Sequence, residues 1–245
     1  MKRYGLIGNP LGHSFSRKYF LEKFQREHLS GIDYLNFEIK NLPSEIPALK
    51  QDPELCGLNV TIPYKTDIIS YLDKISPETA GIKACNCIRI RGGIWEGFNT
   101  DITGFKESFL PLRRAEQNKA LILGTGGSSR AVAWVLQTEG IEFLYVSRTA
   151  SPEKGIIDYS MLTEELLETY TIVINTTPVG MYPHVHDCPD IPYSLVSRHH
   201  YFFDLVYNPD PTEFLIRARA RGAVIKNGSD MLSIQAEESW KIWNS

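Results

Sequence analysis

The stretch that decides the fold is "KALILGTGGSSRAVAWVLQTEGIEFLYVSRT", which runs from Lys119 to Thr149. It consists of an apolar run, a glycine-rich turn, a helix-like stretch, a further glycine and a second apolar run. This order predicts a strand–helix–strand unit of the kind that builds a parallel sheet. The chain is therefore expected to have an α/β fold.

The turn inside this unit reads Gly124-Thr125-Gly126-Gly127-Ser128-Ser129. Backbone amides at the start of the following helix can hold a pyrophosphate, and glycine lets the phosphates come close. The usual fingerprint has a third glycine where this chain has Ser129, and Gly127 is an additional glycine. A purely structural turn is the alternative, but the strand–turn–helix–strand context favours a dinucleotide site.

The second strand of the unit ends in Ser147-Arg148-Thr149. An NAD site is expected to have Asp or Glu at this point, because a carboxylate bonds the ribose 2′-hydroxyl. Arg148 would instead attract a 2′-phosphate, so the expected cofactor is NADP. The alternative is that Arg148 is only a solvated surface arginine.

On both sides of this unit, strand-like and helix-like stretches continue to alternate. In the first half, strands are expected over residues 3–9, 33–39 and 56–62, helices over 14–28 and 64–72, and a hairpin turn at Gly92-Gly93. In the second half, strands are expected over 171–177 and 201–207, and a helix ends the chain.

Size and composition limit the class of protein. The chain has 245 residues, of which 42% are hydrophobic, and its formal net charge is −3. These values fit an ordinary globular protein and give no sign of a nucleic-acid or membrane surface. No apolar run approaches membrane-spanning length, and the apolar run at the start is too short for a signal peptide, so a cytoplasmic protein is expected.

The cysteines and histidines give no sign of a metal site. The spacing of the cysteines fits neither a disulfide framework nor a zinc site, and small buried side chains are expected instead. Two histidine pairs lack a carboxylate or cysteine partner at ligand spacing, so no metal is expected. The residues concerned are Cys56, Cys85, Cys87, Cys188, His184, His186, His199 and His200.

Four polar clusters lie in the first half of the chain, which has no phosphate-binding signature. They are His13–Ser16, Asn59–Lys65, Cys85-Asn86 and Asn99–Asp101. Their amides and hydroxyls suit the hydroxyl groups of a small polyhydroxylated acid, and the serines suit its carboxylate. Each cluster alone is more typical of a helix cap or a turn.

Together and in this order, the clusters resemble the shikimate dehydrogenase family. The resemblance runs the whole chain, and the combination of "NVTIPYK" (Asn59–Lys65) with "NTD" (Asn99–Asp101) is specific. The other matching residues are Gly8-Asn9-Pro10, His13–Ser16, Asn86, Gly104, Gly124–Gly127, Arg148-Thr149, Asn175–Met181, Asp204–Pro209, Gly228, Met231-Leu232 and Gln235.

The resemblance implies a reaction and an architecture. The reaction is the reversible, NADPH-dependent reduction of 3-dehydroshikimate to shikimate in aromatic amino-acid synthesis. The architecture is an α/β substrate-binding domain over residues 1–101 and a Rossmann-type NADP-binding domain over residues 102–228, with a cleft between them. The terminal helix, 229–245, would pack back on the first domain. A small-molecule substrate and a monomer or homodimer are expected, with no nucleic-acid or membrane partner.

The motif match also implies roles for single residues. Lys65 and Asp101 would be the catalytic pair, in which the Lys65 ammonium stabilises the developing alkoxide and gives or relays a proton while Asp101 holds it. Ser14 and Ser16 would hold the substrate carboxylate. The other substrate-lining residues would be Asn59, Thr61, Asn86, Tyr207 and Gln235. The cofactor-binding residues would be Gly124, Thr125, Gly126, Gly127, Ser128, Ser147, Arg148, Thr149, Thr176, Leu205 and Gly228.

Three residues depart from the family's pattern: Arg17 replaces a proline, Cys87 a threonine and Ser147 an asparagine. None removes a catalytic group, but they leave the substrate range and the preference for NADP open. One rival prediction is a quinate/shikimate dehydrogenase that uses NAD, and Arg148 argues against it. The other is a non-catalytic NADP- or shikimate-binding regulator, and the presence of both Lys65 and Asp101 argues against that.

Overall fold

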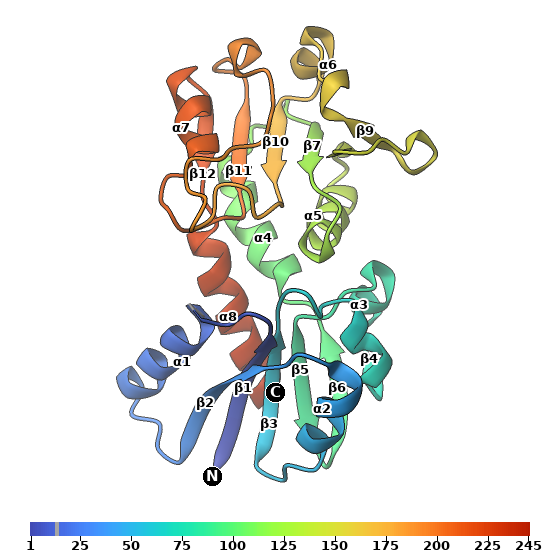
Figure 1. Ribbon diagram of the computed structural model, residues 1–245. Helices are drawn as coiled ribbons and strands as arrows, with labels where there is room; N and C mark the ends of the chain where they lie inside the picture. Colours follow the sequence, from blue (N-terminus) through green and yellow to red (C-terminus); the bar gives the residue numbers. More distant parts are fainter. Residues whose placement is uncertain (13–14) are drawn as a thin grey trace. The chain divides into compact units, whose positions relative to one another are not determined.

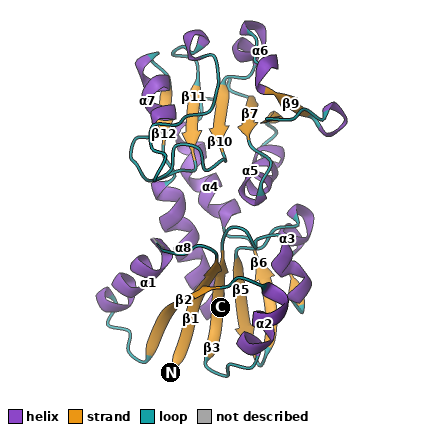
Figure 2. Cartoon of the chain, viewed as in Figure 1, coloured by secondary structure: helices purple, strands orange, loops and turns teal. Residues whose placement is uncertain are grey.

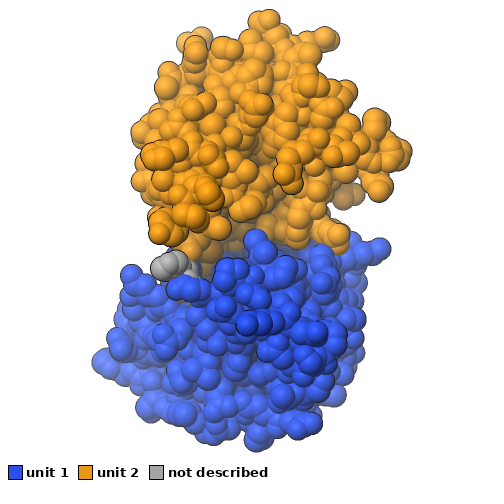
Figure 3. Space-filling view, in the orientation of Figure 1, with its two compact units in different colours: residues 1–103, 233–245 blue, residues 104–232 orange. Residues whose placement is uncertain are grey.

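A computed structural model describes residues 1–12 and 15–245 of the chain (Figure 1). Helices flank two separate sheets of six strands each (Figure 2). The chain divides into two compact units, which are Met1–Thr103 with Ser233–Ser245, and Gly104–Leu232 (Figure 3). The predicted α/β fold class is confirmed. No helix within the described ranges is long and apolar enough to cross a membrane.

The sheet of the first unit mixes parallel and antiparallel strands in the order β2-β1-β3-β5-β6-β4. Strands β1, β2 and β3 are parallel, whereas β5 and β6 form an antiparallel hairpin. Gly92 and Gly93 connect the hairpin with φ of 56° and 77°, the left-handed conformation that glycine adopts without strain. The strands are β1 (Lys2–Gly8), β2 (Ile32–Glu38), β3 (Leu55–Val60), β4 (Lys74–Ile75), β5 (Cys87–Arg91) and β6 (Ile94–Phe98).

Helices cover both faces of this sheet. The helices are α1 (Phe15–Arg26), α2 (Leu42–Lys50), α3 (Pro77–Ile82) and α8 (Ser229–Asn244). Ile46 of α2 packs with Ile7 and Val60 in one apolar core, while Phe20 of α1 and Trp243 of α8 pack in another. Alternation along the strands sends successive side chains to these two cores.

Trp243 fixes the last turns of α8 on the sheet. Its indole Nε1 donates to the Ile88 carbonyl at 3.0 Å, and its ring stacks on Tyr4 at 4.8 Å between centroids. A Cβ at Gly57 would lie 2.5 Å from the indole ring, so β3 can accept this close approach only with glycine there. From Ser233 onward the terminal helix thereby belongs to the first unit.

The sheet of the second unit is entirely parallel, in the order β12-β11-β10-β7-β8-β9. The strand order reverses between β7 and β10, and ligands of such sheets bind at the carboxyl ends of the strands next to this point. Helix α4 (Asp101–Phe109) begins in the first unit and continues into the second from Gly104. The other elements are β7 (Lys119–Leu123), α5 (Gly127–Thr138), β8 (Glu142–Ser147), β9 (Ile156–Asp158), α6 (Glu164–Thr169), β10 (Ile172–Asn175), β11 (Tyr201–Asp204), α7 (Glu213–Ala220) and β12 (Val224–Lys226).

The helix predicted over residues 64–72 is wrong. The chain makes turns after β3 and then a short 3₁₀ helix, η1 (Asp67–Tyr71). The Lys65 carbonyl accepts the Cys85 N–H at 2.7 Å, and the Tyr64 hydroxyl donates to the Ile39 carbonyl at 2.6 Å. Because these contacts with distant segments replace the helical pattern, the backbone at Lys65 is held by tertiary structure.

Candidate active site

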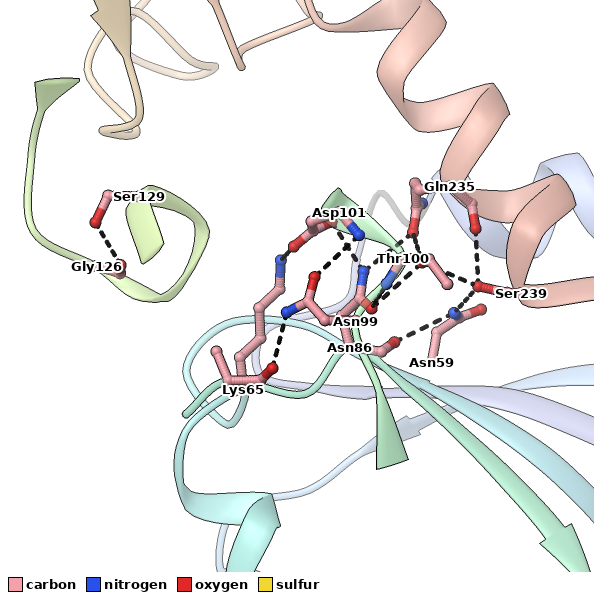
Figure 4. Close-up of polar contacts among 11 residues, drawn as sticks. Asn59, Lys65, Asn86, Asn99, Thr100, Asp101, Gly126, Ser129, Gln235 and Ser239 are labelled. Carbon is pink, nitrogen blue, oxygen red and sulfur yellow. Dashed lines mark hydrogen bonds and ion pairs between the residues drawn. The ribbon is translucent and has the colours of Figure 1, made fainter. Parts of the chain in front are cut away.

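Lys65 and Asp101 form an ion pair in the first unit (Figure 4). Lys65 Nζ lies 2.6 Å from Asp101 Oδ2, and the two side chains are 13% and 7% exposed. Lys65 stands in the turn after β3, and Asp101 is the first residue of α4. Partial burial strengthens the attraction of such a pair compared with one in bulk water. A charged ammonium with limited access to water is therefore available at this point.

The Asp101 carboxylate is held from two sides. Its other oxygen, Oδ1, accepts the Asn86 Nδ2–H at 2.8 Å, and its backbone N–H donates to Asn99 Oδ1 at 3.1 Å. Asn99 is itself fixed, since its Nδ2 donates to the Ala84 carbonyl at 2.8 Å. With each carboxylate oxygen engaged by a different donor, the orientation of Asp101 toward Lys65 is fixed.

Asn86 connects Asp101 with helix α8. Asn86 Oδ1 accepts the Thr100 N–H at 2.7 Å, so its Nδ2 group faces Asp101. The same Nδ2 donates to Gln235 Oε1 at 3.4 Å, and Gln235 is 9% exposed. Residues 65, 86, 101 and 235, which are far apart in the sequence, thus meet in one polar network (Figure 4).

The remaining substrate-lining candidates differ in their surroundings. Asn59 is buried in β3 and belongs to the network through a 2.9 Å hydrogen bond to Ser239 Oγ. Thr61 is half-buried just after β3, and Ser16 is half-buried in α1 and hydrogen-bonded to Tyr34. Tyr207 lies in the second unit, in the loop after β11, and burial raises its pKa. Ser14 lies outside the described residues.

The glycine loop of the second unit suits an anionic ligand. Gly124 has a φ of +102°, and a Cβ there would lie 2.8 Å from Thr177 Cγ2, so both its conformation and its surroundings require glycine. Gly126 caps α5 without any side-chain hydrogen bond, and a Cβ there would meet open space. The N-cap residue of α5 thus has no side chain that could occupy the space in front of the first amides, which fits a pyrophosphate.

The other cofactor-binding candidates follow the carboxyl ends of the strands in the same sheet. Ser147 ends β8, and Arg148 and Thr149 after it are exposed. Thr176 follows β10 and donates to the Leu123 carbonyl at 2.7 Å. A Cβ at Gly228 would lie 2.4 Å from the Leu205 carbonyl oxygen, so the loops after β11 and β12 touch through their backbones. The candidates therefore share the sheet edge at which a dinucleotide binds in this fold.

Two hydroxyls that connect this network were not among the predicted site residues. Thr100 and Ser239 are both fully buried, and their hydroxyls lie 3.3 Å apart. Ser239 follows Gln235 by four residues and so shares its helix face, which was the available signal. Among residues 1–12 and 15–245, no three metal-ligating side chains form a cluster that could hold an ion.

A two-unit α/β fold with a Lys–Asp pair in one unit and a glycine loop in the other defines an NAD(P)-dependent oxidoreductase. The profile of the shikimate dehydrogenase substrate binding domain matches residues 6–88. A shikimate dehydrogenase (NADP(+)) of Caldanaerobacter subterraneus subsp. tengcongensis is 34% identical over 258 residues, which cover 99% of this chain and 91% of that protein. The chain belongs to the shikimate dehydrogenase family.

Solved structures agree with this assignment. The crystal structure of shikimate dehydrogenase from Aquifex aeolicus has a TM-score of 0.89 and 31% identity, and the match covers 100% of this chain and 92% of that one. Quinate dehydrogenase from Corynebacterium glutamicum in complex with NAD has a TM-score of 0.87 and 25% identity, covering 99% and 93%.

The predicted family, activity and cofactor are thereby confirmed. The chain is an NADP-dependent oxidoreductase of the CH–OH group, and the general role of its family is aromatic amino-acid synthesis. Its substrates are small molecules, those of shikimate dehydrogenase. The roles of single residues stay predictions.

Proposed function

We propose that Lys65 and Asp101 carry the proton transfer when the chain reduces 3-dehydroshikimate to shikimate. The observation that supports this proposal is the 2.6 Å ion pair between Lys65 and Asp101, whose side chains are 13% and 7% exposed. Bound NADPH supplies the hydride that adds to the carbonyl carbon. The Lys65 ammonium bonds the carbonyl oxygen, stabilises its developing negative charge and donates the proton. Asp101 holds the Lys65 ammonium in position through the ion pair.

The substrate is held by the polar side chains around this pair. Ser14 and Ser16 bind its carboxylate, and Thr61, Asn86 and Gln235 bind its hydroxyl groups. The motif match adds Tyr207 to the substrate-binding residues. Hydroxyls and amides are the groups that recognise a polyhydroxylated acid, because each can donate and accept hydrogen bonds. The support for this set is the motif match together with the network that joins Asn86 and Gln235 to Asp101.

The cofactor is held by the second unit. The amides of the Gly124–Ser128 loop bind the pyrophosphate, and Arg148 binds the 2′-phosphate that distinguishes NADP from NAD. Ser147, Thr149, Thr176, Leu205 and Gly228 border it at the carboxyl ends of β8, β10, β11 and β12. The support is the glycine-dependent geometry at Gly124 and the exposure of Arg148.

The test is a spectrophotometric assay of the purified chain with shikimate and NADP⁺, and separately with NAD⁺ and with quinate. We expect turnover of shikimate with NADP⁺ and far weaker use of NAD⁺. Faster oxidation of quinate with NAD⁺ would instead favour the activity of the Corynebacterium glutamicum relative. Binding of both ligands without turnover would favour a regulator. A monomer or homodimer and a cytoplasmic location stay predictions.

A further inference from the structure

Three buried polar residues adjoin the Lys65–Asp101 network without touching the ion pair itself. They are Tyr34 of β2, Asn59 of β3 and Ser239 of α8, which are 0%, 4% and 0% exposed. Burying a polar group destabilises a fold unless the group is hydrogen-bonded. Three such residues from three different elements therefore suggest that the hydrogen bonds between them have a function.

Both ends of the Asn59 amide have hydrogen-bond partners within the protein. Its Nδ2 donates to Ser239 Oγ at 2.9 Å and to the Asn86 carbonyl at 3.3 Å, and its Oδ1 accepts the Tyr34 hydroxyl at 2.9 Å. An amide nitrogen has two N–H groups, and both are used here. Asn59 therefore has no N–H group left for a substrate hydroxyl.

The direction of these bonds follows from the partners. The Asn86 carbonyl can only accept, so the Nδ2 end of Asn59 must face it, and Oδ1 must face Tyr34. The Ser239 hydroxyl donates to the Gln235 carbonyl at 2.8 Å and so accepts from Asn59. The Asn86 carbonyl consequently determines the orientation of the amide, and the Tyr34 hydroxyl donates to the oxygen that this orientation presents to it.

We infer that Asn59, together with Tyr34 and Ser239, is a positioning residue for the catalytic pair. The Asn86 carbonyl accepts both Asn59 Nδ2 and the Val60 N–H, the latter at 2.9 Å, so the backbone of Asn86 is fixed from β3. The Asn86 side chain then holds Asp101 Oδ1, and Asp101 holds Lys65. This inference rests on the proposed function.

The first test removes the Ser239 hydroxyl, because Ser16 is bonded to Tyr34 and a change at Tyr34 reaches the carboxylate-binding serine as well. In Ser239→Ala, we expect kcat for shikimate oxidation to fall about tenfold, the effect of one lost buried hydrogen bond on the barrier. The KM for shikimate should change less than about twofold, since no substrate contact is lost, and the pH–rate profile should shift because the Lys65–Asp101 pair is disturbed.

Two matched variants separate positioning from packing. Ser239→Thr keeps a hydroxyl and should restore kcat. Ser108→Ala removes the hydroxyl of another buried helical serine, whose Oγ has no hydrogen-bond partner within the described part of the chain, and should leave kcat unchanged. An unchanged kcat in Ser239→Ala, or a rise in KM alone, would overturn the inference. If the wild-type chain itself does not turn over shikimate, the proposed function is overturned instead.

A double-mutant cycle provides the second test if Ser239→Ala proves unstable at assay temperature. Tyr34→Phe keeps the ring and removes the hydroxyl that donates to Asn59 Oδ1 and is also bonded to Ser16. Because both changes act through one amide, Tyr34→Phe with Ser239→Ala should lower kcat about as much as one change alone. Effects that multiply would mean that the two hydroxyls act separately, which contradicts the inference.

The control for Tyr34→Phe is Tyr201→Phe in the second unit. It loses a buried hydroxyl that is bonded to the Phe109 carbonyl at 3.2 Å.

Discussion

Each unit of the chain buries an aspartate, Asp101 in the first and Asp204 in the second, but the partners of the two carboxylates differ. Asp101 has a cation, Lys65 Nζ, at 2.6 Å. Asp204 ends β11, is 0% exposed and accepts three neutral donors: Thr212 Oγ1 at 2.6 Å, Asn175 Nδ2 at 2.9 Å and the Val206 N–H at 3.0 Å. No ion pair of Asp204 occurs among the described residues.

The difference in partners indicates different roles, catalysis for Asp101 and stability for Asp204. A buried carboxylate beside an ammonium keeps a charged, proton-bearing group ready for a substrate. A carboxylate that only neutral groups surround is costly to ionise, and burial raises the pKa of Asp204 to about 7. Asp204 fixes the start of the loop that carries Tyr207 and ties it to Asn175. We therefore expect catalysis to depend on the first pair and stability to depend on the second network.

The largest expected effect belongs to Lys65. Lys65→Met should lower kcat by roughly 10²–10⁴ with a smaller change in shikimate binding, because one electrostatic and acid–base group is lost. The matched control is Lys23→Met, which removes another buried lysine of the first unit, paired with Glu27 and Glu237 at 2.6 and 2.9 Å. Steady-state kinetics of both variants check this. Near wild-type turnover in Lys65→Met would remove Lys65 from the mechanism.

The Asp204 network should appear in the pH dependence of stability. Between about pH 4 and pH 7 the folded chain holds a proton on Asp204 that the unfolded chain releases, since the folded pKa of about 7 exceeds the ordinary 3.8. The contribution of Asp204 to the free energy of unfolding is therefore largest below pH 4. It falls as the pH rises to 7 and is constant above that. The advantage of wild type over Asp204→Asn should shrink by at most about 4 kcal/mol across this window.

Urea unfolding of wild type and Asp204→Asn at several pH values measures this difference. Asp210→Asn, which removes an exposed carboxylate of the same loop, is the control. A wild-type advantage that instead grows with pH would show that the three donors stabilise the ionised carboxylate and that burial is the weaker effect.

A smaller effect is expected on cofactor binding at Arg148, which follows β8 in the second unit. The proposed binding group there is an exposed charge, whereas Asp204 belongs to a buried hydrogen-bond network. Arg148→Ala should weaken NADP⁺ binding about ten- to a hundredfold and leave NAD⁺ nearly unchanged, because only NADP⁺ has a 2′-phosphate. Titration calorimetry with both cofactors measures this, with Arg219→Ala on α7 as the exposed control. Equal losses for both cofactors would make Arg148 a structural residue.

The second unit was the easier one to predict from the sequence. Its strand–turn–helix–strand unit has long apolar runs and glycines whose geometry only glycine tolerates, as at Gly124. Strand β11 is shorter than expected and ends at Asp204, where the side chain bonds the Val206 N–H. Local signals were therefore sufficient for the elements, but not for their ends.

The first unit depended on contacts that no local pattern encodes. The turn at Lys65 takes its shape from the Cys85 N–H, twenty residues away in the chain. Lys65 and Asp101 could be paired only through the family resemblance, since 36 residues separate them. The bond between Asn59 and Ser239 spans 180 residues, so no local pattern could predict it.

The central claim is that Lys65 and Asp101 act as one unit, and a double-mutant cycle on kcat tests it most directly. Wild type, Lys65→Met, Asp101→Asn and the double variant are compared at saturating shikimate and NADP⁺. If Asp101 works through Lys65, the double variant should be about as slow as Lys65→Met alone. If the two losses multiply in the double variant, the residues act independently and the account of the pair is contradicted.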